Sequence, residues 1–286
     1  MSRYTKIPTH AVKLLPNNQR ESKVQLSDML CEREWLDNSG DMPLSSEYTG
    51  LAQAIRTAKA NKKPVIFFLS GHVIKHGLSA FIISLMEEGF ITHVACNGAV
   101  AIHEWELAYS GSTSEDVGKY IVDGRFGHWE TPSQLNDVVF RDFDGFLTIG
   151  EMLGRQMHED MVAKDFSIIR KGYDLNIPVT FHVLVGGDIN HQHPNTDSSY
   201  FAASYEDFLV LGGSMMNLEG GVFVNIGSQV TGTEVFLKAL SMSRNIAVQR
   251  GTPPNTKITT AMADFVKLPD NWRDGTASEG DAAYYY

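Results

Sequence analysis

The sequence predicts an α/β protein built on a doubly wound parallel sheet, and two observations lead to this prediction. Short apolar runs rich in valine, isoleucine and phenylalanine alternate with longer segments whose apolar residues recur at helical spacing. The runs are apolar throughout rather than at every second position, which is typical of strands buried on both faces. A Rossmann-like sheet with helices on both sides is therefore expected.

The expected elements follow in order along the chain. PVIFFLS and ITHVACN are short β-branched runs stopped by Gly71 and Gly98, as expected of buried strands. Gly89 is placed to cap the helix that precedes the second run. Residues 145–154 fit a strand or a helix. The full set comprises helices at 50–63, 79–89, 103–111, about 150–172 and 233–245, and strands at 64–70, 91–97, 177–188, 208–213 and 221–228.

Composition divides the chain into three parts. Residues 1–48 are polar and irregular, and we expect them to form an N-terminal arm. Residues 49–252 hold the alternating elements and are expected to form a single α/β nucleotide-binding domain. Residues 253–286 are expected to form a C-terminal tail.

Charge and composition exclude several classes of partner. The formal net charge of -10 argues against nucleic acid and against an anionic membrane surface, because both require a basic face. No apolar run approaches the ~18 residues of a membrane span. Two cysteines and an N-terminus without the apolar segment of a secretory signal indicate a cytoplasmic protein. The expected partner is a small-molecule substrate.

Small residues stand at the end of every predicted strand, in the motifs LSGH, CNGA, VGGD, LGGS and NIGS. Ligands of open parallel sheets bind beyond the carboxyl ends of the strands, where backbone N–H groups can approach a phosphate or a ribose. Ordinary tight turns also need glycine, so these motifs alone leave that alternative open. Neither GxGxxG nor GxxxxGK[ST] is present.

The order of these motifs carries a family resemblance. Ser70–Gly77 stands where a Ser-Asn-Leu-Ile-Ser-Ser-Gly loop would follow the first strand, and Asn97–Glu104 stands where Thr-Gly-Ala-Asn-Leu-Tyr-His-Asp would follow the next. Leu211–Ser214 corresponds to Leu-Gly-Gly-Gly, Asn225–Gly227 to Asn-Thr-Gly, and Gly232–Glu234 to Pro-Asp-Glu. Over residues 60–245 the chain thus resembles the deoxyhypusine synthase family and its bacterial relatives, whose fold also underlies the sirtuins.

The resemblance implies a deoxyhypusine synthase-like NAD-binding fold, NAD as cofactor and a homotetramer with sites between subunits. It places an amine substrate near the helix that starts at Glu234, and NAD near Glu104 and several of the small residues. With the neighbouring residues of the same loops, the expected cofactor site comprises Ser70, Gly71, His72, Asn97, Gly98, Gly187, Gly212, Gly213, Asn225, Gly227 and Ser228.

The sequence departs from the family at the reactive lysine. The family lysine follows the helix-start glutamate by six residues in a Trp-Gly-Lys sequence, and Leu240 stands at that place here. Lys238 comes two residues earlier, and two residues rotate a helix by about 200°. Lys238 could form an imine only if the helix register shifts. The family's acidic segment and His-His pair are also absent, so we expect an enzyme other than a true deoxyhypusine synthase.

The segment GGDINHQHP follows a predicted strand with an unusual density of polar groups. Asp188 and His191 are expected to contact substrate, as carboxylate and base. Asp188, His191 and His193 together could instead bind zinc or iron, since imidazole and carboxylate suit these metals. A third interpretation is a solvated loop in which Asp188 forms an Asx turn.

Two further groups are candidates for chemistry. His103 titrates near neutral pH and could act as a base, while Glu104 could hold an ammonium group; a capped helix start is the alternative. His72, Lys75 and His76 could bind phosphate, or belong to an ordinary helix turn. The expected catalytic set is His103, Glu104, Asp188, His191, Glu234 and Lys238.

These expectations give one function and two alternatives. We expect an NAD-binding enzyme, a transferase or an oxidoreductase, that acts on a small polar or amine substrate. The first alternative is a non-catalytic nucleotide-binding module, and the second is a metal-dependent enzyme that uses the loop of Asp188, His191 and His193.

Overall fold

The computed structural model describes residues 3–29, 45–265 and 278. Its centre is a parallel sheet with strand order β5-β3-β2-β6-β7, formed by Val179–His182, His93–Asn97, Val65–Leu69, Val222–Ile226 and Thr259–Ala263. A separate antiparallel pair joins β1 (Ser22–Gln25) to β4 (Ser112–Glu115). The fold is therefore α/β with a parallel sheet, as predicted.

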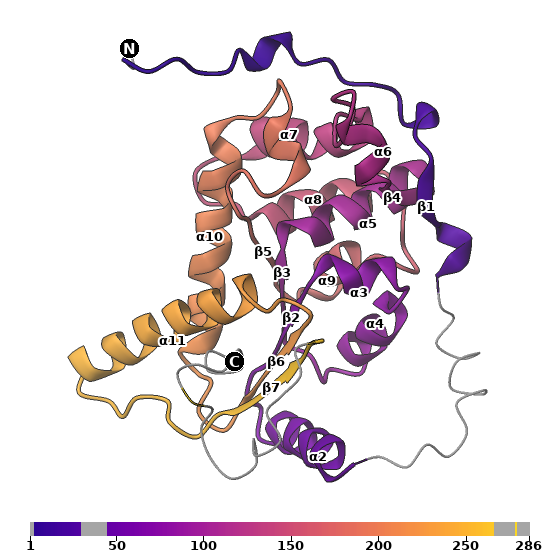
Figure 1. Ribbon diagram of the computed structural model, residues 1–286. Helices are drawn as coiled ribbons and strands as arrows, with labels where there is room; N and C mark the ends of the chain where they lie inside the picture. Colours follow the sequence, from indigo (N-terminus) through magenta and orange to yellow (C-terminus); the bar gives the residue numbers. More distant parts are fainter. Residues whose placement is uncertain (1–2, 30–44, 266–277, 279–286) are drawn as a thin grey trace.

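Helices cover both faces of the sheet (Figure 1). On one face, Ile66 and Phe68 of β2 pack with α10 (Ser198–Met215) and α11 (Thr231–Gln249). On the other face, Val65, Phe67 and Leu69 pack in a larger core. This core includes α2 (Ser46–Ala60), α3 (Gly71–Lys75), α4 (Ser79–Glu87), α5 (Gly98–Ser110), α7 (Glu130–Asp142), α8 (Ile149–Glu159) and α9 (Ile168–Leu175). Alternate residues of one strand thus enter two cores, which explains the continuous apolar runs.

Several element predictions are confirmed with shifted ends. The strands expected at 64–70, 91–97 and 221–228 are β2, β3 and β6, and the strand expected at 177–188 is β5, which ends at His182. The ambiguous segment 145–154 starts α8, because Thr148 and Glu151 form a capping box there. The short helix α6 (Val117–Ile121) begins at Asp116, whose side chain accepts a hydrogen bond from the N–H of Lys119.

The strand predicted at 208–213 is wrong, since these residues lie within α10. Asp197 starts this helix by accepting a hydrogen bond from the N–H of Ser199. Buried residues recur every three or four positions along α10, at Tyr200, Ala203, Asp207, Leu211 and Met215. The six-residue apolar run is therefore part of a longer, 18-residue helical pattern.

The two ends of the chain take part in the fold more than expected. The segment expected as a tail contributes β7, which pairs with β6 and extends the sheet beyond residue 252. The segment expected as an arm contributes β1 and buries Arg20. Among the described residues no helix is long and apolar enough to cross a membrane.

Candidate functional site

The strand order places a topological switch point between β2 and β6. From β2 the chain adds β3 and then β5 on one side, and later adds β6 and β7 on the other. Loops that leave β2 and β6 therefore diverge, and ligands of doubly wound sheets bind outside the carboxyl ends of such strands. Here the diverging loops begin with Ser70-Gly71 and Gly227-Ser228.

Strand register aligns the first residues of these loops. Leu69 is paired with Cys96 and with Ile226, so Ser70 lies between Asn97 and Gly227. The N–H of Ser70 donates to the carbonyl of Ile226 at 3.1 Å. Gly227 has φ +69, and a Cβ built there would lie 2.7 Å from the Ser70 hydroxyl. A side chain at residue 227 would thus be strained and would crowd the space in front of Ser70.

Three polar atoms at this edge are buried and have no hydrogen-bond partner among the described residues. They are Oγ of Ser70, Oδ1 of Asn97 and Oγ1 of Thr233 in the first turn of α11. Burying an unpaired polar atom costs roughly 1–3 kcal/mol, so three such atoms at one sheet edge indicate a place for a polar ligand or for water. Thr233 was not among the residues predicted from the sequence.

Asn225 and Ser228 shape the turn between β6 and α11. The Asn225 amide donates to the carbonyl of Ser228 at 2.9 Å and accepts from its N–H at 3.2 Å. The Ser228 hydroxyl accepts from the N–H of Gly232 at 3.1 Å. A Cβ on Gly232 would lie 2.5 Å from the Asn225 amide nitrogen. Both side chains therefore hold the N-terminus of α11 close to the end of β6.

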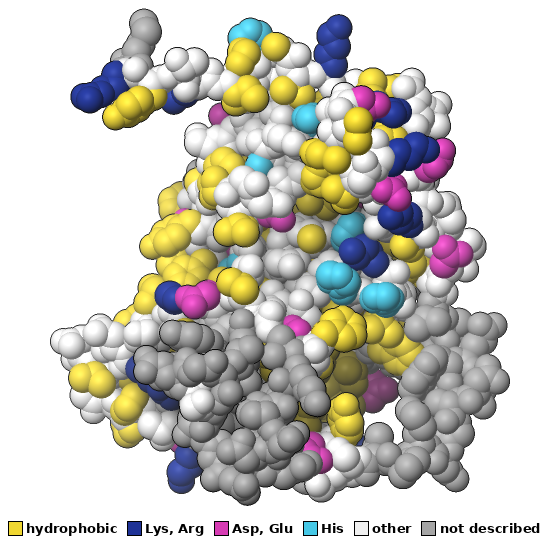
Figure 2. All heavy atoms as spheres, in the orientation of Figure 1, with side chains coloured by type: hydrophobic (Ala, Val, Ile, Leu, Met, Phe, Trp, Pro, Cys, Tyr) yellow, Lys and Arg dark blue, Asp and Glu magenta, His cyan; other side chains and the backbone are white. Residues whose placement is uncertain are grey.

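A basic group follows β2 on the short helix α3. His72 and His76 are exposed and stack at 6.3 Å between ring centroids, and Lys75 lies between them in sequence. Figure 2 shows histidine side chains gathered beside a basic side chain over α3. Burial lowers the pKa of Lys75; burial, followed by the charge of Lys75, lowers that of His72. Lys75 gives this side of the sheet edge a positive charge beside two polar imidazole rings.

His103 lies behind α3 on the facing helix α5. Its ring is close to Gly71, where a Cβ would lie 2.8 Å from Cδ2 of His103. Burial, and then the nearby charge of Lys75, lower the pKa of His103 to about 3. The imidazole is therefore neutral at physiological pH and can accept a hydrogen bond or a proton only through a lone pair.

Asp188 covers the start of α5. A Cβ on Gly98 would lie 2.2 Å from Oδ2 of Asp188, so only glycine fits there. The same oxygen accepts from the N–H of Leu184 at 3.3 Å. Burial raises the pKa of Asp188 to about 6. The carboxylate is thus held by the chain next to Asn97, at the carboxyl end of β3.

A pocket of about 160 Å³ opens beside Asp188. Nδ1 of its His191 accepts from the N–H of Gly186 at 3.2 Å, which leaves the proton on Nε2 when the ring is neutral. This Nε2 is buried without a partner among the described residues. A donor and a carboxylate therefore stand in one small pocket, whose lining is Phe126, Gly186, Gly187, Asp188, Ile189, His191 and Gln192.

The metal site suggested by the sequence is not supported. Nε2 of His193 donates to the carbonyl of Gly127 at 2.6 Å, and the side chain is fully buried. Within the described part of the chain, no group of three or more His, Cys, Asp or Glu side chains is placed to hold a metal ion. The His-x-His spacing does not bring the rings together because η4 (Ile189–Gln192) is a 3-10 turn rather than an extended segment.

The side chains of three further predicted residues bond to other parts of the chain. Glu104 is fully buried and accepts hydrogen bonds from Ser167 and from the N–H groups of Ile168 and Ile169, so it caps α9. Glu234 and Lys238 form an ion pair on α11 with side chains 52% and 61% exposed. Neither arrangement directs a carboxylate or an amine to the sheet edge.

Gly212 and Gly213 lie in the last turns of α10, which is followed within a few residues by the amino end of β6. They are therefore at the opposite edge of the sheet from Ser70 and Gly227. The predicted strand at 208–213 had placed them wrongly, because a helix that returns to the start of a parallel strand ends at the amino edge.

Replacing Gly212 or Gly213 with alanine is expected to leave ligand binding unchanged. No atom lies within 4 Å of a Cβ built at either position, and alanine favours a helix over glycine by up to about 1 kcal/mol. Urea unfolding should show equal or slightly greater stability, and titration with a nucleotide should give the wild-type affinity. A clear loss of nucleotide affinity in either variant would contradict this placement.

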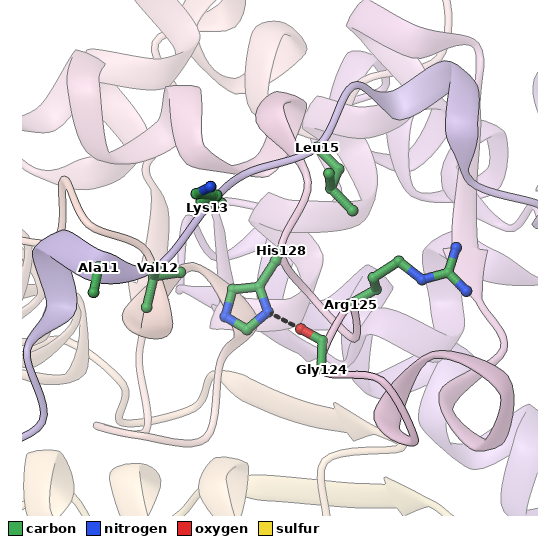
Figure 3. Close-up of a pocket in the computed structure, with 7 residues that line it drawn as sticks. All are labelled: Ala11, Val12, Lys13, Leu15, Gly124, Arg125 and His128. Atoms are coloured by element: carbon green, nitrogen blue, oxygen red, sulfur yellow. Dashed lines mark hydrogen bonds between the residues drawn. The ribbon is translucent and has the colours of Figure 1, made fainter.

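A larger pocket of about 340 Å³ lies between the N-terminal segment and the turn before α7 (Figure 3). Its His128 donates from Nδ1 to the carbonyl of Gly124 at 2.8 Å, and its Arg125 pairs with Asp123. No strand of the sheet contributes to its lining, and two of its three basic side chains, Arg125 and His128, are already bonded. The lining residues are Ala11, Val12, Lys13, Leu15, Gly124, Arg125 and His128.

No protein-family model matches the chain, and no curated protein matches its sequence. Similar solved structures include a putative deoxyhypusine synthase from Entamoeba histolytica, with 12% identity, TM-score 0.43 and coverage of 80% of this chain and 96% of that one. A putative LOR/SDH protein from Methanococcus maripaludis S2 has 10% identity and TM-score 0.46, covering 87% and 68%.

The arginine dihydrolase ArgZ of cyanobacteria has 14% identity and TM-score 0.43, covering 75% of this chain. The chain spans 27% of the length of ArgZ. Likenesses of this extent and identity assign neither an activity nor a substrate to the chain.

Proposed function

We propose that the chain binds a dinucleotide of the NAD type between the carboxyl ends of β2 and β6. The observation that carries this proposal is the set of buried, unpartnered polar atoms on Ser70, Asn97 and Thr233 at the switch point. A hydroxyl, an amide oxygen and a second hydroxyl match the hydrogen-bonding groups of ribose and carboxamide.

The loops around these atoms fit a dinucleotide. Gly227 lets a ligand approach the backbone, and the 19-residue helix α11 starts beside it with the unpartnered hydroxyl of Thr233 in its first turn. Free N–H groups and the helix dipole favour a phosphate at such a place. The partly exposed side chain of Lys75 on α3 adds a positive charge nearby.

We further propose that the pocket beside Asp188 takes a small polar or amine-bearing substrate. With a pKa raised to about 6, Asp188 is mostly ionised at neutral pH, and its side chain is partly buried. A carboxylate there attracts an ammonium group, and Nε2 of His191 can donate to a polar atom of the same molecule. A bound NAD would supply a hydride acceptor.

Deoxyhypusine synthesis is not proposed. Glu234 and Lys238 pair with each other on an exposed face of α11, so no lysine of this helix is placed to form an imine at the pocket. The same observation favours a second candidate function, a module that binds a nucleotide without catalysis. Measuring NAD reduction with a panel of small amines separates the two, because only an enzyme would produce NADH.

The first experiment measures NAD binding to the purified protein and to Ser70→Ala. The hydroxyl of Ser70 has no partner among the described residues, so its loss should change stability by less than about 0.5 kcal/mol. The same loss should weaken NAD binding by about fivefold to tenfold if the hydroxyl bonds the ligand. Calorimetric titration gives the affinity, and mass spectrometry after denaturation detects nucleotide that co-purifies.

Ser243→Ala is the matched control. Ser243 is buried at the other edge, where its hydroxyl donates to the carbonyl of Met215 and accepts from Asn255. This variant should lose about 1–2 kcal/mol of stability and keep the wild-type affinity for NAD. The proposal is wrong if no nucleotide co-purifies and titration shows no binding.

A further inference from the structure

A chain of four buried or partly buried side chains leads from the N-terminal segment to His103. Arg20 forms an ion pair with Glu106 of α5, and both side chains are 1% exposed. The hydroxyl of Thr113 on β4 lies 2.5 Å from Oε2 of Glu106 and 2.7 Å from Nδ1 of His103. Thr113 is fully buried.

The ion pair determines where the protons lie in this row of four side chains. Glu106 beside the guanidinium of Arg20 is a carboxylate and can only accept. Thr113 has one hydroxyl proton and donates it to Glu106, so its oxygen can only accept from His103. Nδ1 of His103 therefore carries the ring proton, and Nε2 presents a lone pair.

This lone pair faces the loop that follows β2. A Cβ built on Gly71 would lie 3.2 Å from Nε2 of His103 and 2.9 Å from Cβ of Ala99. Gly71 is the residue after Ser70, whose hydroxyl is unpartnered at the switch point. No hydrogen bond from Nε2 to a described residue is found, and the His103 side chain is only partly buried by its surroundings.

We propose that His103 is a hydrogen-bond acceptor for the molecule bound at the switch point, held in one tautomer by Thr113, Glu106 and Arg20. The group that it takes is a hydroxyl or N–H donor, such as a ribose hydroxyl. This inference deepens the proposed function and rests on it. His103 contacts the ligand, whereas Thr113, Glu106 and Arg20 are positioning residues. The N-terminal segment, through Arg20, thus supports the site without contacting the ligand.

The tautomer is measured first, by nitrogen NMR of the full-length protein labelled in histidine. The expected spectrum shows a neutral His103 ring with the proton on Nδ1. A spectrum with the proton on Nε2, or with a charged ring, at neutral pH would overturn the inference whether or not a nucleotide binds.

Two substitutions at Thr113 then connect the tautomer to binding. Thr113→Ser keeps the hydroxyl and should keep both the tautomer and the affinity for NAD. Thr113→Val removes the acceptor, so the ring proton should move to Nε2 and NAD should bind about tenfold more weakly. A shifted tautomer with unchanged affinity would overturn the role of His103 as acceptor.

A second variant serves if Thr113→Val does not fold. In His103→Asn the shorter amide can still donate to Thr113 but has no atom at the place of Nε2. Its affinity for NAD should fall about tenfold while its thermal stability stays near that of the wild type; an unchanged affinity would overturn the inference. Absence of NAD binding in the wild type, together with an Nδ1 proton, would instead refute the proposed function.

Discussion

Gly150→Ala is expected to lower the free energy of unfolding by about 3 kcal/mol or more. Gly150 lies in the first turn of α8, which packs on β5. A Cβ built there would lie 1.6 Å from the carbonyl oxygen of Val179 and 2.8 Å from its carbon. The obstacle is backbone rather than a flexible side chain, and Val179 is fixed by its pairing with Val94. Urea unfolding of the purified variant measures the loss.

Gly50→Ala is the matched control for this substitution. Gly50 lies inside α2 and no atom is within 4 Å of a Cβ built there. Alanine should therefore stabilise the protein by about 0.5–1 kcal/mol through its helix propensity. A loss below 1 kcal/mol in Gly150→Ala would show that α8 can move away from β5, contrary to the packing described.

Glu104→Ala is expected to cost about 3 kcal/mol, the second large effect. The carboxyl group accepts from the hydroxyl of Ser167 at 2.7 Å and from the N–H groups of Ile168 and Ile169 at 2.9 and 3.0 Å. Alanine leaves these buried donors at the start of α9 without an acceptor. Glu159→Ala, on an exposed position of α8, should change stability by less than about 0.5 kcal/mol.

The cost of keeping Glu104 buried depends on pH. Burial raises its pKa from an ordinary value of 4.5 to about 7, so between these values the folded protein holds a proton that the unfolded chain has lost. The contribution of this group to stability is full below pH 4.5 and falls by about 1.4 kcal/mol per pH unit until pH 7.

Glu104→Gln isolates this dependence because glutamine has the shape of the protonated acid and does not titrate. The difference in unfolding free energy, wild type minus Glu104→Gln, should decrease steadily from pH 5 to pH 7. A difference that is constant or increases over this range would mean that the carboxyl group is already ionised in the folded protein.

Part of the site was predictable because it depends on local sequence. Each of Ser70, Asn97 and Gly227 stands at or just after the end of an apolar run, and parallel strands place their carboxyl ends at one edge. Thr233 carried a weaker signal, as a hydroxyl residue in the turn after the same kind of run. Thr233 was not predicted as a site residue because the family motif matched there pointed to the neighbouring Glu234.

Other residues carried no such signal. Arg20 lies 86 residues before Glu106 in the sequence, and only packing connects it to Glu106 and Thr113 behind His103. The sequence suggested His193 as a metal ligand, but Nε2 of its ring donates a hydrogen bond to the carbonyl of Gly127. The partner of a polar side chain is set by whichever distant segment the fold brings into contact, and no local pattern encodes that.

By itself the sequence determined the fold class and predicted the edge of the sheet at which the candidate site lies. Four of the five runs that are apolar at every position form buried strands, and small residues follow each of them. The tertiary structure alone decided that FLVLGG belongs to α10 and that Glu104 caps α9. A six-residue apolar run satisfies a strand or a buried helix equally, and a carboxylate takes the nearest donor in space rather than in sequence.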